Sequence, residues 1–474
     1  MNPIIQKPPL CVDLDGTLVA TDTFWESVLL LLKTKPLIVF LLPIWLYKGR
    51  AHVKHQLAQY VTLPVATLPY RQNVLTFLHQ QHKQGRILIL ATGAHNSIAQ
   101  AVAEHIQLFS TVIATDEHTN RVGTAKRDEL RQRFDSYDYM GDSLTDIPVL
   151  EGAQCPFLVA PSKQLQRKIA CPPEQTFLAL ERTVFTWLKV LRPQQWIKNI
   201  LLFLPLILSY QLLNLSKLTE ASIAFVAFCL AASAGYVLND LLDLTADRQH
   251  PTKKDRPFAA GHLPIQYGLP FFVLLLTVSL LIAGWFLSGS FLGILVLYLM
   301  LTLTYSLYLK QRPIVDVLLL AGLYAQRVLA GGIATTIDIS AWLLAFSIFL
   351  FTSLAFLKRY VELGLLNVQE DTIHSRGYKY TDRAIIANAG LTNGYLAVLV
   401  LALYINDETS RVLYHSPIFL WLICPLLLYW ITRIWFLAHR QQMSDDPVQF
   451  ALLDLMSWSI ALCVIGLLIL AKFL

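Results

Sequence analysis

The feature that most constrains the fold is a long stretch of sequence without charge. Residues 257–309 contain no Asp, Glu, Lys or Arg over 53 positions, with the turn-forming residues 288–290 inside the stretch. Because about 20 apolar residues cross a bilayer as a helix, this stretch is long enough for two spans. The whole chain is 55% hydrophobic and 15% charged, against about 25% charged in soluble domains. The composition excludes a disordered chain and favours a multi-pass membrane protein.

The C-terminal part of the chain is predicted to cross the membrane nine times. The expected spans lie near residues 199–215, 220–239, 267–287, 291–308, 314–335, 340–358, 384–405, 416–436 and 450–471. Fifteen Lys and Arg residues fall on one side of these spans and three on the other. Loops rich in Lys and Arg stay in the cytoplasm. We therefore expect the N-terminus and the polar loops on the cytoplasmic side of the inner (cytoplasmic) membrane, and the C-terminus outside.

The N-terminal part, residues 1–183, has a different pattern. Short apolar runs are separated by helical stretches, and this alternation is typical of a parallel α/β sheet. The runs lie at residues 10–14, 87–91, 112–114, 137–140 and 157–160. About 70 residues separate the first two runs, which is too long for a simple crossover and indicates an inserted cap at about residues 20–85. The predicted domains are thus residues 1–183 and 184–474.

Polar side chains gather at the ends of these predicted strands. They are Asp13, Asp15 and Thr17 in DLDGT, Thr92 in ILATGA, Lys126 in GTAKRDEL, and Asp142 and Asp146 in GDSLTDIP. Ligands of open parallel sheets bind at the carboxyl ends of the strands, so we expect these groups to converge. Clustered carboxylates repel one another and favour a cation, and oxygen ligands suit Mg²⁺. One carboxylate can attack phosphorus and another can act as acid and base. A DxD pair alone is also found in simple capped turns.

Taken together, these motifs resemble the haloacid dehalogenase superfamily of phosphohydrolases, over roughly residues 8–165. The resemblance implies an α/β Rossmann-like domain with a helical cap that selects the substrate. It also implies the roles of the individual groups. Asp13 would be the nucleophile, Asp15 the general acid and base, Thr17, Thr92 and Lys126 the phosphate contacts, and Asp13, Asp15, Asp142 and Asp146 the Mg²⁺ site.

Inside the predicted cap, residues 28–47 read VLLLLKTKPLIVFLLPIWLY. Two lysines and two prolines interrupt this segment, so neither of its arms can span a bilayer. It is interpreted as a segment that lies in the membrane interface. The alternative is that its apolar residues form the core of the cap.

A second acidic motif follows the second predicted span. Asp240, Asp243 and Asp247 are spaced i, i+3, i+7, which places them on one face of a helix. Asn239 adjoins them, and Arg256 follows among further basic residues. Ionisable residues at the end of a span are costly and indicate function. Carboxylates on one face can hold Mg²⁺ that bridges to a diphosphate.

More polar groups fall on the same side of the membrane. They are Lys198, Asn199, Lys310, Asp316, Arg327, Lys358 and Arg359. Arg327 comes eleven residues, or about three helical turns, after Asp316, so these two are expected to share a face. Each basic residue could also be an anchor whose charged end reaches the membrane surface.

Residues 187–474 resemble the UbiA-type intramembrane prenyltransferases, an all-α bundle of nine transmembrane helices. The resemblance rests on NDxxDxxxD, and LRPQQWIKN, YSLYLK and FLKRYVEL bring the chain near the polyprenyl-phosphate phosphoribosyltransferases. It implies that Asp240, Asp243 and Asp247 hold Mg²⁺ and a diphosphate, with Asp240 and Asp243 counted as catalytic, and that Asn239 supports them. The implied phosphate or substrate contacts are Lys198, Asn199, Arg256, Lys310, Arg327, Lys358 and Arg359.

The loop after the sixth span, residues 358–383, has no clear second aspartate-rich motif and is dominated by cations. A phosphoribosyl diphosphate donor and a polyprenyl phosphate acceptor together carry more phosphate groups than a prenyl diphosphate, so extra cations favour that pair. The sequence therefore predicts a bifunctional enzyme that transfers 5-phosphoribose to polyprenyl phosphate and then removes the 5-phosphate, for cell-envelope glycan synthesis. The expected partners include the bilayer and exclude nucleic acid, and homo-oligomerisation is left open.

Two alternatives stay open at this point. One is a UbiA-type aromatic prenyltransferase that uses a prenyl diphosphate and is fused to a phosphatase of unrelated substrate. The other is a lipid-binding or transport protein with vestigial sites, against which the intact DLDGT and NDxxDxxxD motifs argue.

Overall fold

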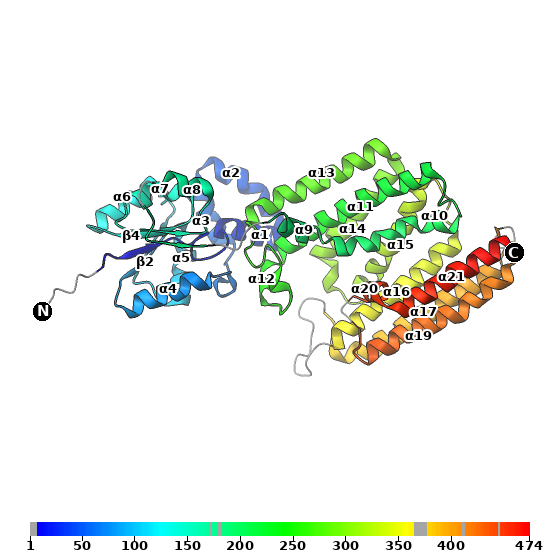
Figure 1. The fold of residues 1–474 in the computed structure, drawn as a ribbon. Helices are drawn as coiled ribbons and strands as arrows, with labels where there is room; N and C mark the ends of the chain where they lie inside the picture. The colour runs from blue at the N-terminus through cyan, green and yellow to red at the C-terminus, as the bar shows by residue number, and fades with distance from the viewer. Residues whose placement is uncertain (1–6, 170–171, 179–182, 365–376, 409–412, 444–445) are drawn as a thin grey trace. The chain divides into compact units, whose positions relative to one another are not determined.

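The structure is a computed structural model that describes residues 7–169, 172–178, 183–364, 377–408, 413–443 and 446–474 (Figure 1). The chain forms two compact units. One unit combines residues 1–192 with 236–274, and the other combines 193–235 with 275–474. The aspartate-rich segment thus belongs to the same unit as the N-terminal residues. The boundary expected between residues 183 and 184 stays a prediction.

The first unit is built on a six-stranded parallel sheet with the strand order β3-β2-β1-β4-β5-β6. Its strands are β1 (Leu10–Val12), β2 (Leu88–His95), β3 (Thr111–Thr115), β4 (Asp138–Gly141), β5 (Pro156–Val159) and β6 (Gln175–Phe177). Cys11 on the central strand pairs with Ile89 on one side and Tyr139 on the other. All three residues of β1 are fully buried. Five strands were predicted. The sixth was missed because only Phe177 of its three residues is buried.

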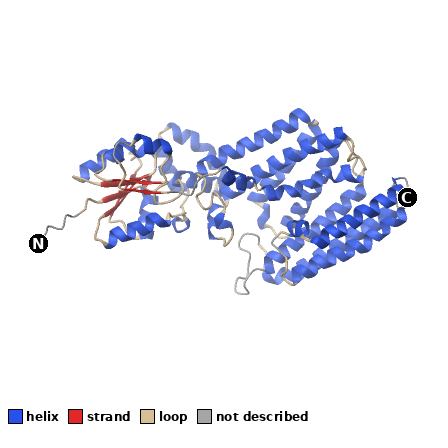
Figure 2. Ribbon diagram, viewed as in Figure 1, coloured by secondary structure: helices blue, strands red, loops and turns tan. Residues whose placement is uncertain are grey.

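Helices cover both faces of this sheet (Figure 2). Between β1 and β2 lie α1 (Thr23–Thr34), η1 (Pro36–Leu41), α2 (Leu42–Tyr47), α3 (Arg50–Tyr60), η2 (Val65–Thr67) and α4 (Gln72–Lys83). The later helices are α5 (Asn96–Ile106), α6 (Thr124–Arg133), η3 (Leu144–Asp146), α7 (Ile147–Glu151), α8 (Lys163–Lys168) and α9 (Val184–Leu191). The doubly wound order with a helical insertion after β1 confirms the predicted α/β fold with a cap.

Part of the apolar segment at residues 28–47 is buried in the cap core, and part of it is exposed at the surface. Val28 and Leu31 on α1 pack into the cap core with Trp45. Leu37 and Phe40 are 80% and 78% exposed. The first arm of the segment therefore forms cap core, and η1 presents apolar side chains at the surface.

The membrane part contains eight helices that are long and apolar enough to span a bilayer, counted over the described residues. The long helices are α11 (Leu215–Leu242), α13 (Gly268–Phe286), α14 (Gly289–Leu307), α15 (Val315–Thr335), α16 (Ala341–Gly364), α17 (Arg383–Asn406), α19 (Ile423–His439) and α21 (Leu455–Phe473). Shorter elements are η4 (Pro193–Phe203), α10 (Leu204–Leu208), α12 (Leu244–Gln249), η5 (Lys253–Asp255), η6 (Ile265–Tyr267), η7 (Leu309–Gln311), η8 (Tyr380–Asp382), η9 (Pro417–Leu422) and α20 (Pro447–Leu453). In the second unit α16 packs against α15 and α17.

The count of long apolar helices among the described residues is eight, one fewer than the nine predicted spans, and the difference lies at the first span. The segment predicted as a span at 199–215 is a 3₁₀ helix, η4, followed by the five-residue α10. Pro193 and Pro205 each fit only the start of a helix, because proline has no N–H to donate to the preceding turn. Tyr210 then has a left-handed φ of 56°, which ends the run. Hydropathy alone did not reveal these breaks.

Candidate active sites

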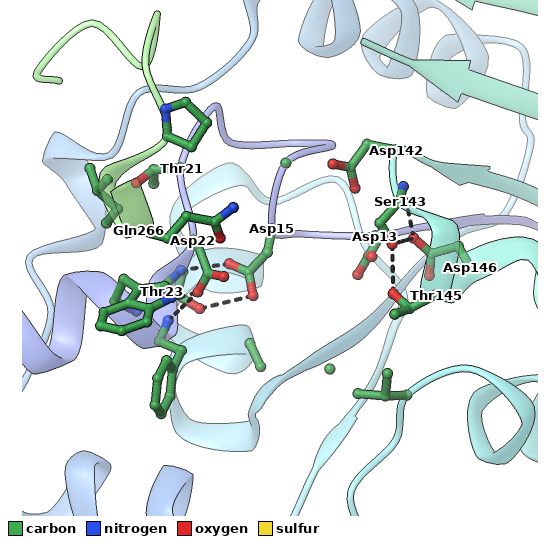
Figure 3. A pocket seen from close by; sticks show the side chains of 18 of the residues that line it. Asp13, Asp15, Thr21, Asp22, Thr23, Asp142, Ser143, Thr145, Asp146 and Gln266 are labelled. Atoms are coloured by element: carbon green, nitrogen blue, oxygen red, sulfur yellow. Dashed lines mark hydrogen bonds between the residues drawn. The ribbon is translucent and has the colours of Figure 1, made fainter. Parts of the chain in front are cut away.

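Three carboxylates meet where β1 and β4 end. Asp13 follows β1, while Asp142 and Asp146 follow β4, the neighbouring strand. Their ligand atoms all lie within 4.8 Å of one another (Figure 3). Neighbouring parallel strands have their carboxyl ends at the same edge of the sheet. This explains why residues so distant in sequence lie close together. These three acids could hold a divalent cation through oxygen ligands alone.

Lys126 joins this acidic cluster from α6. Its Nζ lies 3.2 Å from Asp13 Oδ1 and 3.2 Å from Asp146 Oδ1, and the side chain is 2% exposed. Burial opposes the charge, but Asp13 and Asp146 raise the pKa of Lys126 above its usual range. Lys126 Nζ also donates to Tyr139 Oη at 2.8 Å, and Tyr139 Oη donates to Asp146 at 3.0 Å. Tyr139 was missed because its place in a buried strand gave no signal beyond core packing.

The two predicted threonines differ in their contacts, because Thr17 reaches the acid cluster and Thr92 bonds within its own strand. Thr17 Oγ1 donates to Asp142 Oδ1 at 3.3 Å. Thr92 is fully buried within β2, and its Oγ1 accepts a hydrogen bond from the Ala94 N–H at 3.0 Å. Gly16 has a left-handed φ of +74°, and a Cβ there would overlap the Asp142 carboxylate. The turn after β1 therefore needs glycine so that Asp142 can approach.

Burial shifts the titration of the acids. It raises the pKa of Asp13 to about 6, with Lys126 opposing the shift and Asp146 adding to it. Burial, followed by repulsion from Asp146 and Asp13, also raises the pKa of Asp142. Ionising these carboxyls together is unfavourable without a compensating charge, and a bound cation supplies one. The chemistry of the donor set therefore fits a divalent metal ion.

Asp15 lies apart from the three clustered acids, on the cap side of the cavity (Figure 3). It accepts hydrogen bonds from Thr23 N at 2.8 Å and Thr23 Oγ1 at 3.2 Å. Burial and then the nearby Asp22 raise the pKa of Asp15 to about 8. A carboxyl that keeps its proton at neutral pH is suited to act as a general acid. Asp22 was missed in the sequence, although Asp at the N-cap of α1 is a recognisable signal.

The acids line a cavity of about 1290 Å³. The cap contributes Trp25, Arg50 and Lys54 to its walls. Lys54 Nζ donates to Gly93 O at 2.6 Å and Asn120 Oδ1 at 3.0 Å, so it ties the cap to the end of β2. Burial lowers the pKa of Lys54, and Asp15 opposes that shift. Sequence reasoning missed Lys54 because a lone lysine on a cap helix resembles a solvated surface residue.

The aspartate-rich motif lies in the same unit, at the end of α11. Asp240 is 2% exposed and forms ion pairs with Arg192 and with Arg256, the latter at 3.1 Å. The same Arg256 Nη1 lies 2.6 Å from Asp247 Oδ2. Asp243 is paired with Lys33 of the cap at 3.0 Å. Each carboxylate of the motif therefore has a cationic partner, and Arg192 and Lys33 were not among the predicted site residues.

The motif does not run along one continuous helix, as its spacing suggested. α11 ends at Leu242 and α12 begins at Leu244, so Asp243 lies at the junction. Hydrogen bonds from Asp243 N to Asn239 O and from Asp247 N to Asp243 O carry the chain across the bend. Asn239 thus supports the turn through its backbone. Over the described residues, only the Asp13 set has all its ligand atoms within 4.8 Å, and the three aspartates of this motif are not brought that close.

The family model of the UbiA prenyltransferases matches residues 202–471, more than half of the sequence. The chain belongs to the UbiA prenyltransferase family. The y4nM protein of Sinorhizobium fredii is 33% identical over 98% of this chain and 91% of its own length. Decaprenyl-phosphate phosphoribosyltransferase of Mycobacterium tuberculosis is 39% identical over 185 residues, which cover 37% of this chain and 60% of that protein.

Among solved structures, a haloacid dehalogenase family hydrolase from Salmonella enterica serovar Typhi aligns with 34% of this UbiA-family chain and 66% of that chain. The identity is 15% and the TM-score 0.27. The N-terminal part has the doubly wound strand order, the inserted cap and the acid cluster described above. The eight long apolar helices and the family match make the chain a multi-pass membrane enzyme.

Within the second unit, the UbiA-family helices bury two polar networks. Arg327 donates from Nε to Asn199 Oδ1 at 2.8 Å and from Nη2 to Tyr298 Oη at 3.2 Å. Asp316, expected to share a face with Arg327, instead accepts from Arg359 Nε at 2.6 Å and from Tyr378 Oη. Both side chains of the Asp316–Arg359 pair are fully buried. In this arrangement Arg327 and Arg359 hold helices together, and their predicted contact with phosphate stays a prediction.

Two of the predicted lysines meet at one aspartate. Lys198 Nζ lies 2.5 Å and Lys358 Nζ 3.9 Å from Asp446 Oδ2. Beside Lys198 lies an apolar cavity of about 260 Å³, whose walls include Leu354 and Trp430. Lys310 is half-buried on η7. Part of the cationic loop, residues 365–376, lies outside the described residues.

Proposed function

We propose that the UbiA-family part of the chain transfers 5-phosphoribose from phosphoribosyl diphosphate to a polyprenyl phosphate. The observation that carries the proposal is that each carboxylate of the aspartate-rich motif already has a cationic partner, drawn from Arg192, Arg256 and Lys33. A donor with a diphosphate and a separate 5-phosphate needs cationic partners as well as a metal. The name of the mycobacterial relative, decaprenyl-phosphate phosphoribosyltransferase, supports transfer of a phosphoribosyl group to a polyprenyl phosphate.

In the proposed transfer, an oxygen of the lipid phosphate attacks the anomeric carbon of the donor. The bond from that carbon to the diphosphate oxygen breaks, and diphosphate leaves with the bonding electrons. Mg²⁺, when bound by Asp240, Asp243 and Asp247, would neutralise charge on the leaving diphosphate. Arg256 bridges Asp240 and Asp247. It can exchange a carboxylate partner for a diphosphate oxygen and hold the leaving group in place.

The N-terminal site would then remove the 5-phosphate. Asp13 attacks phosphorus and forms an aspartyl-phosphate, while Asp15 gives its proton to the departing sugar oxygen. Water, deprotonated by Asp15, next attacks phosphorus, which releases inorganic phosphate and restores Asp13. Lys126, Thr17 and Thr92 hold the phosphoryl oxygens. Asp13, Asp142 and Asp146 would hold Mg²⁺, with Asp15 beside that site, and the final product is polyprenyl-phosphate ribose.

Both steps are proposed on the cytoplasmic face of the inner membrane. The excess of Lys and Arg in the loops on one side supports this orientation. One of these basic segments, residues 248–256 with Arg256, directly follows the aspartate-rich motif in the chain. The lipid product could supply pentose for a cell-envelope glycan.

The test supplies membranes that contain the protein with phosphoribosyl diphosphate labelled in the ribose, polyprenyl phosphate and Mg²⁺. The expected result is an acid-labile labelled lipid that is absent from membranes without the protein. A second incubation offers a prenyl diphosphate and an aromatic acceptor. Prenylation of that acceptor, with no label transferred from phosphoribosyl diphosphate, would overturn the proposal in favour of an aromatic prenyltransferase.

A further inference from the structure

The cavity of the phosphatase-like site has a wall that does not come from the sheet or its cap. Residues 261–267, which follow the aspartate-rich motif, contribute Gly261, Pro264, Ile265, Gln266 and Tyr267 to the cavity lining. They belong to the same compact unit as Asp13 and Asp15. We call residues 261–267 the wall segment. Its position means that a ligand reaching the acids also meets a part of the UbiA-family sequence.

A buried ion pair fixes the chain just before the wall segment. Arg248, the residue after Asp247, donates from Nη2 to Glu26 Oε1 at 2.5 Å and from Nη1 to Glu26 Oε2 at 3.2 Å. The two side chains are only 7% and 6% exposed. Thr21 Oγ1 donates to the same Glu26 at 2.7 Å, and Arg248 Nε donates to Ala259 O at 3.0 Å. A bidentate ion pair of this kind fixes the relative orientation of the two side chains and also stabilises their contact.

Backbone packing fixes the wall segment itself. Gly261 has a left-handed φ of +72°, and a Cβ there would lie 2.6 Å from both Cβ and the carbonyl oxygen of Ala20. Ala20 lies in the turn that follows Asp15. The 3₁₀ turn η6 within the wall segment contacts α1. The wall segment is therefore held against the catalytic turn by close packing that leaves no room for a side chain at position 261.

The wall segment contains a side chain, Gln266, that can form hydrogen bonds with the hydroxyl groups of a sugar. Figure 3 places Gln266 beside Asp22, at the end of the cavity near Asp15. Its amide can donate and accept hydrogen bonds to hydroxyl groups. Tyr267 is 50% exposed and Trp25 lines the same cavity, so apolar surface is also available. At about 1290 Å³ the cavity exceeds the usual ligand pocket of about 300–1000 Å³, so it has room for more than a phosphorylated pentose.

We propose that the wall segment selects the substrate of the phosphatase site, and that Gln266 recognises the sugar of a phosphorylated glycolipid. This inference rests on the proposed function, because it names the transferase product as the substrate that the wall segment accepts. The chain that carries the aspartate-rich motif continues into the wall segment, which would determine the specificity of the phosphatase site. The phosphatase site is then specific only in the presence of the transferase sequence.

The first test compares two substrates of the full-length protein purified in detergent. One is the lipid-linked phosphopentose, and the other is p-nitrophenyl phosphate, which has neither sugar nor lipid. We expect Gln266→Ala to lower the ratio of kcat/KM for the lipid to kcat/KM for p-nitrophenyl phosphate about tenfold, as expected when one hydrogen bond to the substrate is lost. Gln80→Ala, an exposed glutamine of α4 away from the cavity, is the control and should leave the ratio unchanged.

A second variant tests the placement of the wall segment. Gly261→Ala must push the segment away from Ala20, so we expect the same ratio to fall, with the change mainly in KM for the lipid. If that variant does not fold, the Gln266→Ala result decides the matter. Equal losses on both substrates in Gln266→Ala, or no loss on either, would overturn the inference. Failure of the wild-type protein to hydrolyse the lipid substrate at all would instead overturn the proposed function.

Discussion

The chain contains two acidic sites that differ in how their charge is balanced. In the Asp13 site, three carboxylates from two adjacent strands lie together, and the buried Lys126 pairs with two of them, Asp13 and Asp146. In the Asp240 site, each carboxylate of a single chain segment has its own Arg or Lys partner. The first site keeps a deficit of positive charge that a metal ion can fill. In the second, an incoming metal and diphosphate must exchange partners with cations already in place. The contrast suits a small phosphoryl group in one site and a polyanionic donor in the other.

The largest expected effect comes from removing the proposed nucleophile of the Asp13 site, which should separate the activities of the two sites. Asp13→Asn should lower removal of the 5-phosphate on the order of a thousand-fold or more, because no aspartyl-phosphate can form. Transfer of phosphoribose should persist, and chromatography of the labelled lipids should show the phosphorylated lipid accumulating. Asp128→Asn, an exposed acid on α6, serves as control. Unchanged removal of the phosphate in purified Asp13→Asn protein would show that the Asp13 site acts on another substrate.

The converse change removes charge from the second site. Asp240→Asn or Asp243→Asn should lower transfer on the order of a thousand-fold, since a lost metal contact in the transition state is worth several kcal/mol. Hydrolysis of supplied phosphorylated lipid should continue. The nearby exposed Asp255→Asn provides the matched control. Transfer above about a tenth of the wild-type rate in either variant would contradict the metal role.

A smaller effect is expected from the cation that bridges two carboxylates. Arg256→Gln should raise KM for phosphoribosyl diphosphate on the order of tenfold, because a charged hydrogen bond to the donor is lost. It should also remove the ion pair of Arg256 with Asp247 and one of the two ion pairs of Asp240, so the requirement for Mg²⁺ should shift to a lower concentration. Lys254→Gln, the exposed neighbour, should change neither quantity. If KM for phosphoribosyl diphosphate is unchanged in Arg256→Gln, Arg256 does not exchange its carboxylate partner for a diphosphate oxygen.

The smallest effect concerns the acid of the first site. Asp15 has a pKa raised to about 8, so it is protonated below that pH and able to give a proton to the leaving oxygen. When the aspartyl-phosphate forms in the rate-limiting step, its rate should fall as the pH rises through the pKa of Asp15. Asp22→Asn keeps the N-cap of α1 but removes the neighbouring charge, so the alkaline limb should move to lower pH. If the alkaline side of the pH–rate profile stays at the same pH in Asp22→Asn, Asp15 is not the titrating acid.

Local pattern was sufficient to predict most of the fold. The strands β1, β2, β3, β4 and β5 and eight of the long helices carry strong apolar periodicity or long apolar runs. The convergence of Asp13, Asp142 and Asp146 followed from the rule that strand ends meet at one edge. The bend at Asp243 and the broken first span could not be predicted. Both depend on how tertiary packing and proline placement interrupt helices that composition alone would extend.

Partner choice was the least predictable part of the sites. Asp316 and Arg327 share a helix, yet Asp316 pairs with Arg359 from the next helix. The Glu26–Arg248 contact joins residues more than two hundred positions apart. Such contacts are set by the packing of distant elements, and a single sequence carries no signal for them. Site residues that belong to a sequence motif could be predicted. Site residues outside any motif, such as Tyr139 and Lys54, could not.

The central claim is that one chain performs both steps in sequence. It is tested most directly with phosphoribosyl diphosphate that carries radioactive carbon in the ribose and radioactive phosphorus in the 5-phosphate. Purified wild-type protein, given polyprenyl phosphate and Mg²⁺, should move the carbon label into lipid and release the phosphorus label as inorganic phosphate. A lipid product that keeps both labels in the ratio of the donor, or no carbon label in lipid at all, would contradict the account.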